Sequence, residues 1–222
     1  LKEILSVLPS STHLIYDSNK KKKHMKEVWN QRTNFYFENK LGKLFDNYGH
    51  ILKKAKIHYV SSHNNNKMKQ ILIKEKFDYL INAGTQLKIK KEIIDKVKIG
   101  IINIHPGILP NYRGCTCVEW AIYNDHKIGN TVHLMTEEID LGQIIIKEEL
   151  EFKKTDDYQD IRKKVYESGF KLFAKAINKI ETIKFDNNNL HKEDWEYYKV
   201  IDSDKMRCVI SKINNGKYLY QK

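Results

Sequence analysis

Three polar side chains in the middle of the sequence have the types and spacing that acyl-transfer chemistry requires. Asn103 and His105 stand two positions apart in the segment IINIHPGILPNYRG. Asp140 follows in EEIDLGQIII, beside a turn that Gly142 favours. An amide, an imidazole and a carboxylate together can accept a proton and stabilise negative charge on a carbonyl oxygen. The spacing is equally consistent with a turn in which Asn103 and His105 only bond to backbone groups.

The elements that must position these side chains are a buried strand and a stiff loop. Alternate residues of a strand face the same side, so Asn103 and His105 are predicted neighbours at the carboxyl end of the apolar run 99–104. Ligands of open α/β sheets bind at such ends. Pro106 and Pro110 cannot continue a central strand, so they predict a rigid loop with one X-Pro bond as a candidate for the cis form.

Short apolar runs alternate with amphipathic segments, which predicts an α/β fold: Rossmann-like, with a mostly parallel sheet flanked by helices. Strands are expected at 13–16, 57–60, 79–83, 99–104, 131–135 and 143–146. Helices are expected at 66–76, 117–124 and 156–180, the last with Thr155 as its N-cap. Because the first convincing strand begins only at His13, we expect that an opening strand is missing from the sequence or absent from the sheet.

The predicted domain organisation is a catalytic domain over residues 1–183 and a short C-terminal tail over 184–222. Near its end the tail carries the turn-forming residues Asn214, Asn215 and Gly216 between two β-prone runs, which predicts a β-hairpin. An exposed hairpin edge could pair with a second copy, so a homodimer is the further expectation.

The composition is globular: 222 residues, 41% of them hydrophobic, with only three prolines. No apolar run is long enough to span a membrane, and the protein is expected to be cytoplasmic. Cys115 and Cys117 form a C-x-C pair without a second pair, so no metal site is expected. The net charge of +12 is spread along the whole chain and accompanies many Asn and Ile residues, so a nucleic-acid partner is not expected.

These segments resemble the formyltransferases that use 10-formyltetrahydrofolate. Residues 103–110 match the family pattern N-x-H-P-x-x-L-P, and residues 112–114 match the YRG that follows it. Residues 131–145 match T-V-H-x-M-x-x-x-x-D-x-G-x-I-I. The resemblance extends from about Lys56 to Ile180.

The resemblance implies that Asn103, His105 and Asp140 are a catalytic triad, with 10-formyltetrahydrofolate as cosubstrate and no metal. Asn103 and His105 would stabilise the oxyanion as an amine attacks the formyl carbon, and Asp140 would help to move protons. The pterin ring would lie against the backbone of two loops, whose implied cofactor-binding residues are Gln86, Leu87, Lys88, Ile89, Thr136, Glu137 and Ile139. His133, two residues from Thr131, is interpreted as structural.

The family divides by the amine that accepts the formyl group. Purine-pathway members (phosphoribosylglycinamide formyltransferases) resemble proteins with an early Gly-rich loop, whereas the first glycine here is Gly42. Members acting on initiator methionyl-tRNA share YRG but resemble proteins with an added β-barrel, for which the roughly forty residues after Ile180 are too few. A basic nucleic-acid-binding module with a vestigial site is the non-enzymatic alternative, which the presence of all three triad residue types disfavours.

Compact sugar N-formyltransferases look most like this chain. That resemblance implies formylation of a nucleotide-linked amino-dideoxy sugar, such as dTDP-4-amino-4,6-dideoxyglucose, as in O-antigen or glycan biosynthesis. The substrate-binding residues would be Tyr112, Arg113, Trp195 and Tyr197. A guanidinium suits a diphosphate and an aromatic ring suits a base, although packing of the tail onto the core explains these aromatic residues equally well.

Overall fold

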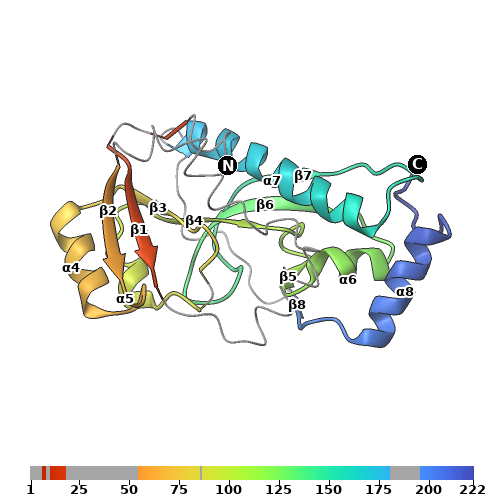
Figure 1. Ribbon diagram of the computed structural model, residues 1–222, viewed down its shortest axis with the longest axis horizontal. Helices are drawn as coiled ribbons and strands as arrows, with labels where there is room; N and C mark the ends of the chain where they lie inside the picture. The colour runs from red at the N-terminus through yellow and green to blue at the C-terminus, as the bar shows by residue number, and fades with distance from the viewer. Residues whose placement is uncertain (1–6, 9–10, 19–54, 86, 181–195) are drawn as a thin grey trace. The chain divides into compact units, whose positions relative to one another are not determined.

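The computed structural model describes residues 7–8, 11–18, 55–85, 87–180 and 196–222 (Figure 1). These residues form two compact units, 1–100 and 101–222, and each unit is described by itself. The sequence predictions for Gln86 and Trp195, and the predicted boundary between residues 183 and 184, lie outside the described residues. Among the described residues, no helix combines the length and the hydropathy that crossing a bilayer requires.

The first unit contains a parallel strand pair with a helix packed against it. Strand β1 (His13–Asp17) pairs in parallel with β2 (Lys56–Val60), and helix α4 (Asn66–Glu75) packs on β2 and on α5 (Lys91–Ile94). Strand β3 (Tyr79–Ile81) follows α4. The helix begins where Asn65 accepts a hydrogen bond from the backbone of Met68, and it buries Met68, Ile71 and Leu72. The β–α–β order of this unit matches the order predicted from the sequence.

The second unit is built around an antiparallel sheet with strand order β4–β6–β7. The strands are β4 (Gly100–His105), β6 (Gly129–Leu134) and β7 (Ile144–Glu149). Helix α7 (Tyr158–Lys179) packs along β6 and β7, as Figure 1 shows. The α/β class is therefore confirmed, with parallel pairing in the first unit and antiparallel pairing in this sheet.

The N-terminus of α7 differs from the prediction of Thr155 as the cap. Asp157 caps the helix: its side chain accepts from the backbone N–H of Asp160, and the Asp160 side chain accepts from the backbone N–H of Asp157. An ionised carboxylate in the first turn also interacts favourably with the helix dipole. Two residues therefore separate the predicted cap from the observed one.

Replacing Asp157 with alanine is expected to lower the free energy of unfolding by about 1 kcal/mol, because the backbone N–H of Asp160 loses its partner. Urea unfolding monitored by circular dichroism measures this change. Thr155→Ala is the matched control, since Thr155 is exposed just outside the helix. An equal effect of the two substitutions would contradict the assignment of the cap.

The predicted C-terminal hairpin is wrong, because residues 203–214 form helix α8 (Ser203–Asn214). The apolar residues Val209 and Ile213 are spaced by four and are buried against α6 (Cys117–Tyr123). Asp202 caps the start of α8, and Gly216 follows its end with a φ of 60°. Asn and Gly residues end helices as readily as they form tight turns, and here they end a helix. The homodimer expectation depended on the hairpin edge and loses that support.

The described part of the tail shares one core with the second unit. The members of this core include Val118, Ile122, Ile161, Val165, Ile201, Val209, Ile213 and Tyr218. Ahead of α8, the short strand β8 (Tyr197–Tyr198) pairs in parallel with β5 (Arg113–Gly114). The tail is thus bound to the loop that carries the YRG segment.

Candidate active site

The register of the antiparallel pair β4–β6 sets the position of the first polar side chains. Asn103 lies directly opposite His133, and His105 lies opposite Thr131. Residues opposite each other in an antiparallel pair present their side chains on the same face. The amide of Asn103 therefore lies beside the imidazole of His133, with 3.2 Å between Nδ2 and Nε2.

Asp140 reaches both histidines from the turn between β6 and β7. Its Oδ2 lies 3.4 Å from His105 Nδ1, and its Oδ1 lies 3.5 Å from His133 Nε2. The backbone N–H of Gly114 donates to Oδ2 at 3.0 Å. Asp140 has a φ of 55°, a left-handed conformation that Asp tolerates better than most residues. The structure thus brings together the three residues that the sequence singled out, with His133 between Asn103 and Asp140.

The orientation of His105 is fixed by a backbone carbonyl. Its Nε2–H donates to the carbonyl of Tyr112 at 2.7 Å, since a carbonyl can only accept. Nδ1 is therefore the nitrogen that faces Asp140. Gly107 lies against the same ring: a Cβ at this position would be 2.6 Å from His105 Nε2. Only glycine leaves room for the observed imidazole position.

The loop after β4 is held by Thr131 of the neighbouring strand. The Thr131 hydroxyl donates to the carbonyl of Gly107 at 2.7 Å and accepts from the N–H of Leu109 at 3.1 Å. The Leu109–Pro110 peptide bond is cis, as one of the two X-Pro bonds was expected to be. The loop is thus fixed on both sides of the point where it passes the His105 ring.

His133 is the residue whose involvement the sequence analysis did not foresee. Its side chain is 1% exposed, and its Nδ1–H donates to the carbonyl of Leu134 at 2.9 Å. Nε2 is left to face Asn103 and Asp140. The sequence signals were its alternation with Thr131 and its place in the T-V-H-x-M match, and the cross-strand register that pairs it with Asn103 appears only in the fold.

Burial and the neighbouring charges act in opposite directions on the pKa values of Asp140 and His105. Burial would raise the pKa of Asp140, but the neighbouring His105, His133 and the Gly114 N–H outweigh it and lower that pKa to about 2. Burial also lowers the pKa of His105, an effect that Asp140 offsets only in part. At neutral pH the site therefore presents an ionised carboxylate to a predominantly neutral imidazole.

The lowered pKa of Asp140 predicts acid-sensitive stability. The folded-state pKa is below the value of about 3.9 for an unfolded Asp, so the carboxylate contributes about 2 kcal/mol above pH 4. This contribution is lost as the pH falls from about 4 through 2. Urea unfolding at several pH values should show the wild type losing this amount relative to Asp140→Asn over that range. The exposed Asp95→Asn is the control, and parallel curves for wild type and Asp140→Asn would contradict the assignment.

Three of the predicted substrate-binding residues are described: Arg113 lies in β5, Tyr112 lies immediately before it, and Tyr197 lies in β8. Tyr112 is 3% exposed: its hydroxyl bonds to His126 Nδ1 at 2.6 Å, and its ring stacks on Tyr198. The Arg113 guanidinium lies 5.2 Å from the centre of the Tyr197 ring, which is partly exposed. Arg113 and Tyr197 therefore form a pair at the surface, whereas the Tyr112 side chain belongs to the core.

The predicted cofactor-binding residues are divided between the two units. In the first unit, Leu87 is exposed, the Lys88 carbonyl accepts from Asn64 Nδ2 at 2.9 Å, and Ile89 is buried. In the second unit, Thr136 donates through its hydroxyl to the carbonyl of Glu138, Glu137 is exposed, and Ile139 is 45% exposed next to Asp140. The described residues thus include an exposed apolar side chain in each of the two loops.

Comparison with known sequences identifies related proteins. The family model described as Formyl transferase matches residues 11–177. Methionyl-tRNA formyltransferase of Clostridium tetani (strain Massachusetts / E88) is 32% identical over 126 residues, which are 56% of this chain and 41% of that relative. The chain spans about half of the length of the curated relatives it matches.

Solved structures with a similar fold include formyltransferases with different substrates. The formyltransferase PseJ from Anoxybacillus kamchatkensis, in complex with UDP-4,6-dideoxy-4-formamido-L-AltNAc and tetrahydrofolate, has a TM-score of 0.60 at 17% identity and covers 94% of this chain and 99% of its own. Phosphoribosylglycinamide formyltransferase from Anaplasma phagocytophilum has a TM-score of 0.60 at 18% identity, covering 88% and 90%. Similarity at this level shows a shared fold.

Proposed function

Because this chain belongs to the formyl transferase family, as the sequence resemblance indicated, we propose that it transfers a formyl group from 10-formyltetrahydrofolate to an amino group of a nucleotide-linked amino-dideoxy sugar. The observation that carries the proposal is the convergence of Asp140 on His105 and His133, with Asn103 bonded to His133. The proposed catalytic domain is residues 1–183, and the tail that follows it supplies β8, the strand that pairs with β5. All three cysteines are free, which suits a cytoplasmic location.

The turn at residues 136–140 fits the proposed cosubstrate. Ile139 exposes an apolar side chain directly beside the buried carboxylate of Asp140, and a flat pterin ring can lie on such a surface. The folate would supply a formyl group that is already activated for transfer to nitrogen.

The geometry assigns different tasks to the polar side chains. Asn103 Nδ2 donates to the formyl oxygen as the amine attacks, and His105 adds the positive charge of its imidazolium once it has taken up the proton of the amine. A carboxylate with a pKa of about 2 is a weak base, so the proton leaving the amine is better held by an imidazole that Asp140 stabilises. Since His105 Nε2–H is committed to the Tyr112 carbonyl, Nδ1 is the atom that takes up this proton and passes it to the folate nitrogen as the bond between that nitrogen and the formyl carbon breaks.

The sugar-nucleotide acceptor is supported by the surroundings of the triad. Arg113 precedes Gly114 in β5, and the partly exposed Tyr197 lies opposite Arg113 in β8. The backbone N–H of Gly114 donates to Asp140. A guanidinium beside an aromatic ring suits a diphosphate next to a base. PseJ, whose complex contains a UDP-linked formamido sugar, shares the fold over 94% of this chain.

Formylation of initiator methionyl-tRNA is the second candidate. It is favoured by the sequence relatives, among which the Clostridium tetani methionyl-tRNA formyltransferase is 32% identical over the matched residues. The net charge of +12 would also assist binding to a polyanion.

Separate assays with a panel of amine acceptors distinguish the two candidate functions. The protein is incubated with 10-formyltetrahydrofolate and, separately, dTDP- and UDP-linked 3-amino and 4-amino sugars, glycinamide ribonucleotide and initiator methionyl-tRNA. Tetrahydrofolate release and the mass of the product are measured. We expect turnover with an amino sugar. Turnover of the tRNA alone, or of glycinamide ribonucleotide alone, would reassign the acceptor, and no turnover with any amine would overturn the enzymatic proposal.

Replacing Gly107 with alanine is expected to reduce kcat about 10- to 100-fold, because the new methyl group displaces the His105 ring from its carbonyl partner. Steady-state kinetics with the identified amine measure the change. Gly169→Ala in α7 is the matched control for adding a methyl group, since a Cβ there comes no closer than 3.0 Å to another atom, the Cδ1 at the end of the Ile104 side chain. An unchanged kcat in Gly107→Ala would contradict the positioning role of this contact.

A further inference from the structure

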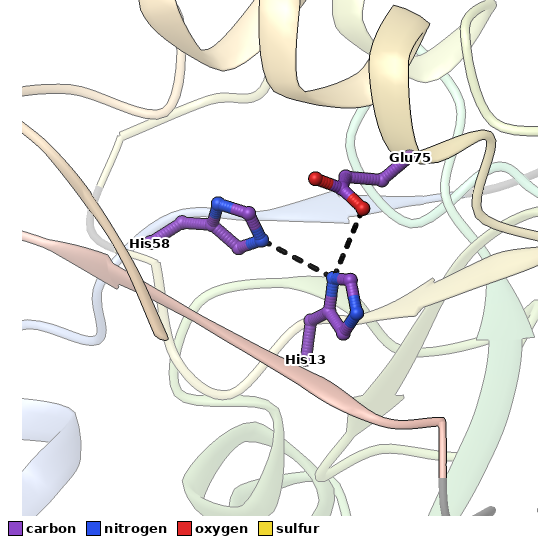
Figure 2. Close-up of side chains that lie close together, drawn as sticks. All are labelled: His13, His58 and Glu75. Atoms are coloured by element: carbon purple, nitrogen blue, oxygen red, sulfur yellow. Dashed lines mark hydrogen bonds and ion pairs between the residues drawn. The ribbon is translucent and has the colours of Figure 1, made fainter. Parts of the chain in front are cut away.

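The first unit contains a cluster of metal-ligating side chains that the proposed reaction does not use. His13, His58 and Glu75 point toward one another, as Figure 2 shows. Nδ1 of His13 lies 3.2 Å from Nε2 of His58 and 3.9 Å from Oε2 of Glu75. All three ligand atoms lie within 4.8 Å of one another.

The fold of the first unit explains why these residues meet. In the parallel register His58 pairs with Ile15, two residues after His13, so both histidines lie on one face of the β1–β2 pair. Glu75 is the last residue of α4, the helix that packs on β2. The cluster lies toward the amino end of β1, where α4 ends after running back along the strands. Ligands in open α/β sheets bind at the opposite, carboxyl ends.

We propose that His13, His58 and Glu75 bind one zinc ion through His13 Nδ1, His58 Nε2 and Glu75 Oε2. Bonds of about 2.0–2.2 Å in a tetrahedral site separate ligand atoms by about 3.3 Å. The observed 3.2 and 3.9 Å are close to this value, and a small rotation of the Glu75 side chain closes the remaining gap. Two imidazoles and one carboxylate leave the fourth position for water.

One oxygen of the Glu75 carboxylate already has a lysine partner. Lys56 occupies Oε1 of that carboxylate, and Oε2 is the oxygen nearest to His13.

Metal titration of the full chain, prepared without a histidine tag and stripped with a chelator, tests the proposal. Calorimetry with Zn²⁺ should give one equivalent of binding, weakened at least about 100-fold in His58→Ala and in Glu75→Gln. Glu92→Gln is the matched control, because Glu92 belongs to the same unit and is also paired with a lysine. Zn²⁺ should raise the melting temperature of the wild type and of Glu92→Gln, and leave that of Glu75→Gln unchanged.

Two further measurements keep the proposal testable if a variant fails to fold. Co²⁺ bound to the wild type should give tetrahedral visible bands without a thiolate charge-transfer band, because no cysteine is a ligand. Lys56→Met should tighten Zn²⁺ binding by removing a competing cation. Absence of a stoichiometric site, a thiolate band, or unchanged binding in folded His58→Ala and Glu75→Gln would each overturn the assignment.

Discussion

Asp140→Asn is expected to lower kcat/KM for formyl transfer by about 10³- to 10⁴-fold while the protein remains folded. The substitution preserves the shape of the side chain but removes the charge that faces His105 Nδ1 and His133 Nε2. Without that charge, an imidazolium that holds the proton of the attacking amine loses its counter-ion. Single-turnover measurement of folate release separates this chemical step from binding.

Variants of other residues provide the rates with which Asp140→Asn is compared. Asn103→Ala and His105→Asn should each cost about 10²- to 10³-fold, the range for removing one oxyanion donor. Asp95→Asn removes an exposed carboxylate of the other unit and should leave the rate unchanged. If Asp140→Asn retained a rate within tenfold of the wild type, the proton-holding role derived from the geometry would be wrong.

Glu119→Ala is expected to lower the free energy of unfolding by about 3–5 kcal/mol, the cost of breaking a buried ion pair. Glu119 is 1% exposed, and its Oε1 lies 3.4 Å from Arg162 Nη1 and accepts the Tyr158 hydroxyl at 2.6 Å. Removal of the carboxylate leaves the Arg162 guanidinium charged within the core between α6 and α7. This loss is a large fraction of the stability of an ordinary domain. Urea unfolding measures it.

The controls for Glu119 separate lost charge pairing from lost volume. The double variant Glu119→Leu with Arg162→Met removes both charges and should recover most of the stability. Glu148→Ala breaks the exposed pair with Lys175 and should change the free energy of unfolding by less than about 1 kcal/mol. Equal effects of Glu119→Ala and Glu148→Ala would show that Arg162 is not held by Glu119.

Local signals in the sequence were enough to predict most elements of the fold. Strand β4 and helices α4 and α7 follow from runs of apolar residues and from helical spacing, which depend only on neighbours in the chain. The C-terminal hairpin failed because Asn214, Asn215 and Gly216 suit both a tight turn and the end of a helix. The segment forms a helix because Val209 and Ile213 are buried against residues of α6, which are distant in the sequence.

The candidate site was predictable only in part. Asn103 and His105 could be found because they alternate in β4 near its end, Asp140 because it lies in the turn before β7, and all three because their motif is specific. His133 could not, since its contact with Asn103 depends on the register between β4 and β6. The His13, His58 and Glu75 cluster depends on a parallel pairing and a helix crossing that no local pattern specifies.

The pairing of β8 with β5 links the C-terminal segment to the Asp140 carboxylate through Gly114. Gly114 donates to Asp140 from one side and lies opposite Tyr198 in the two-strand ladder, with the N–H of Cys115 bonded to the Tyr198 carbonyl. Shortening the protein to its first 183 residues would retain every triad side chain yet remove the partner strand of this loop. We therefore expect the smallest active fragment to extend beyond the segment that contains the motifs. We also expect a label or fusion attached near Tyr197 to lower the rate of formyl transfer.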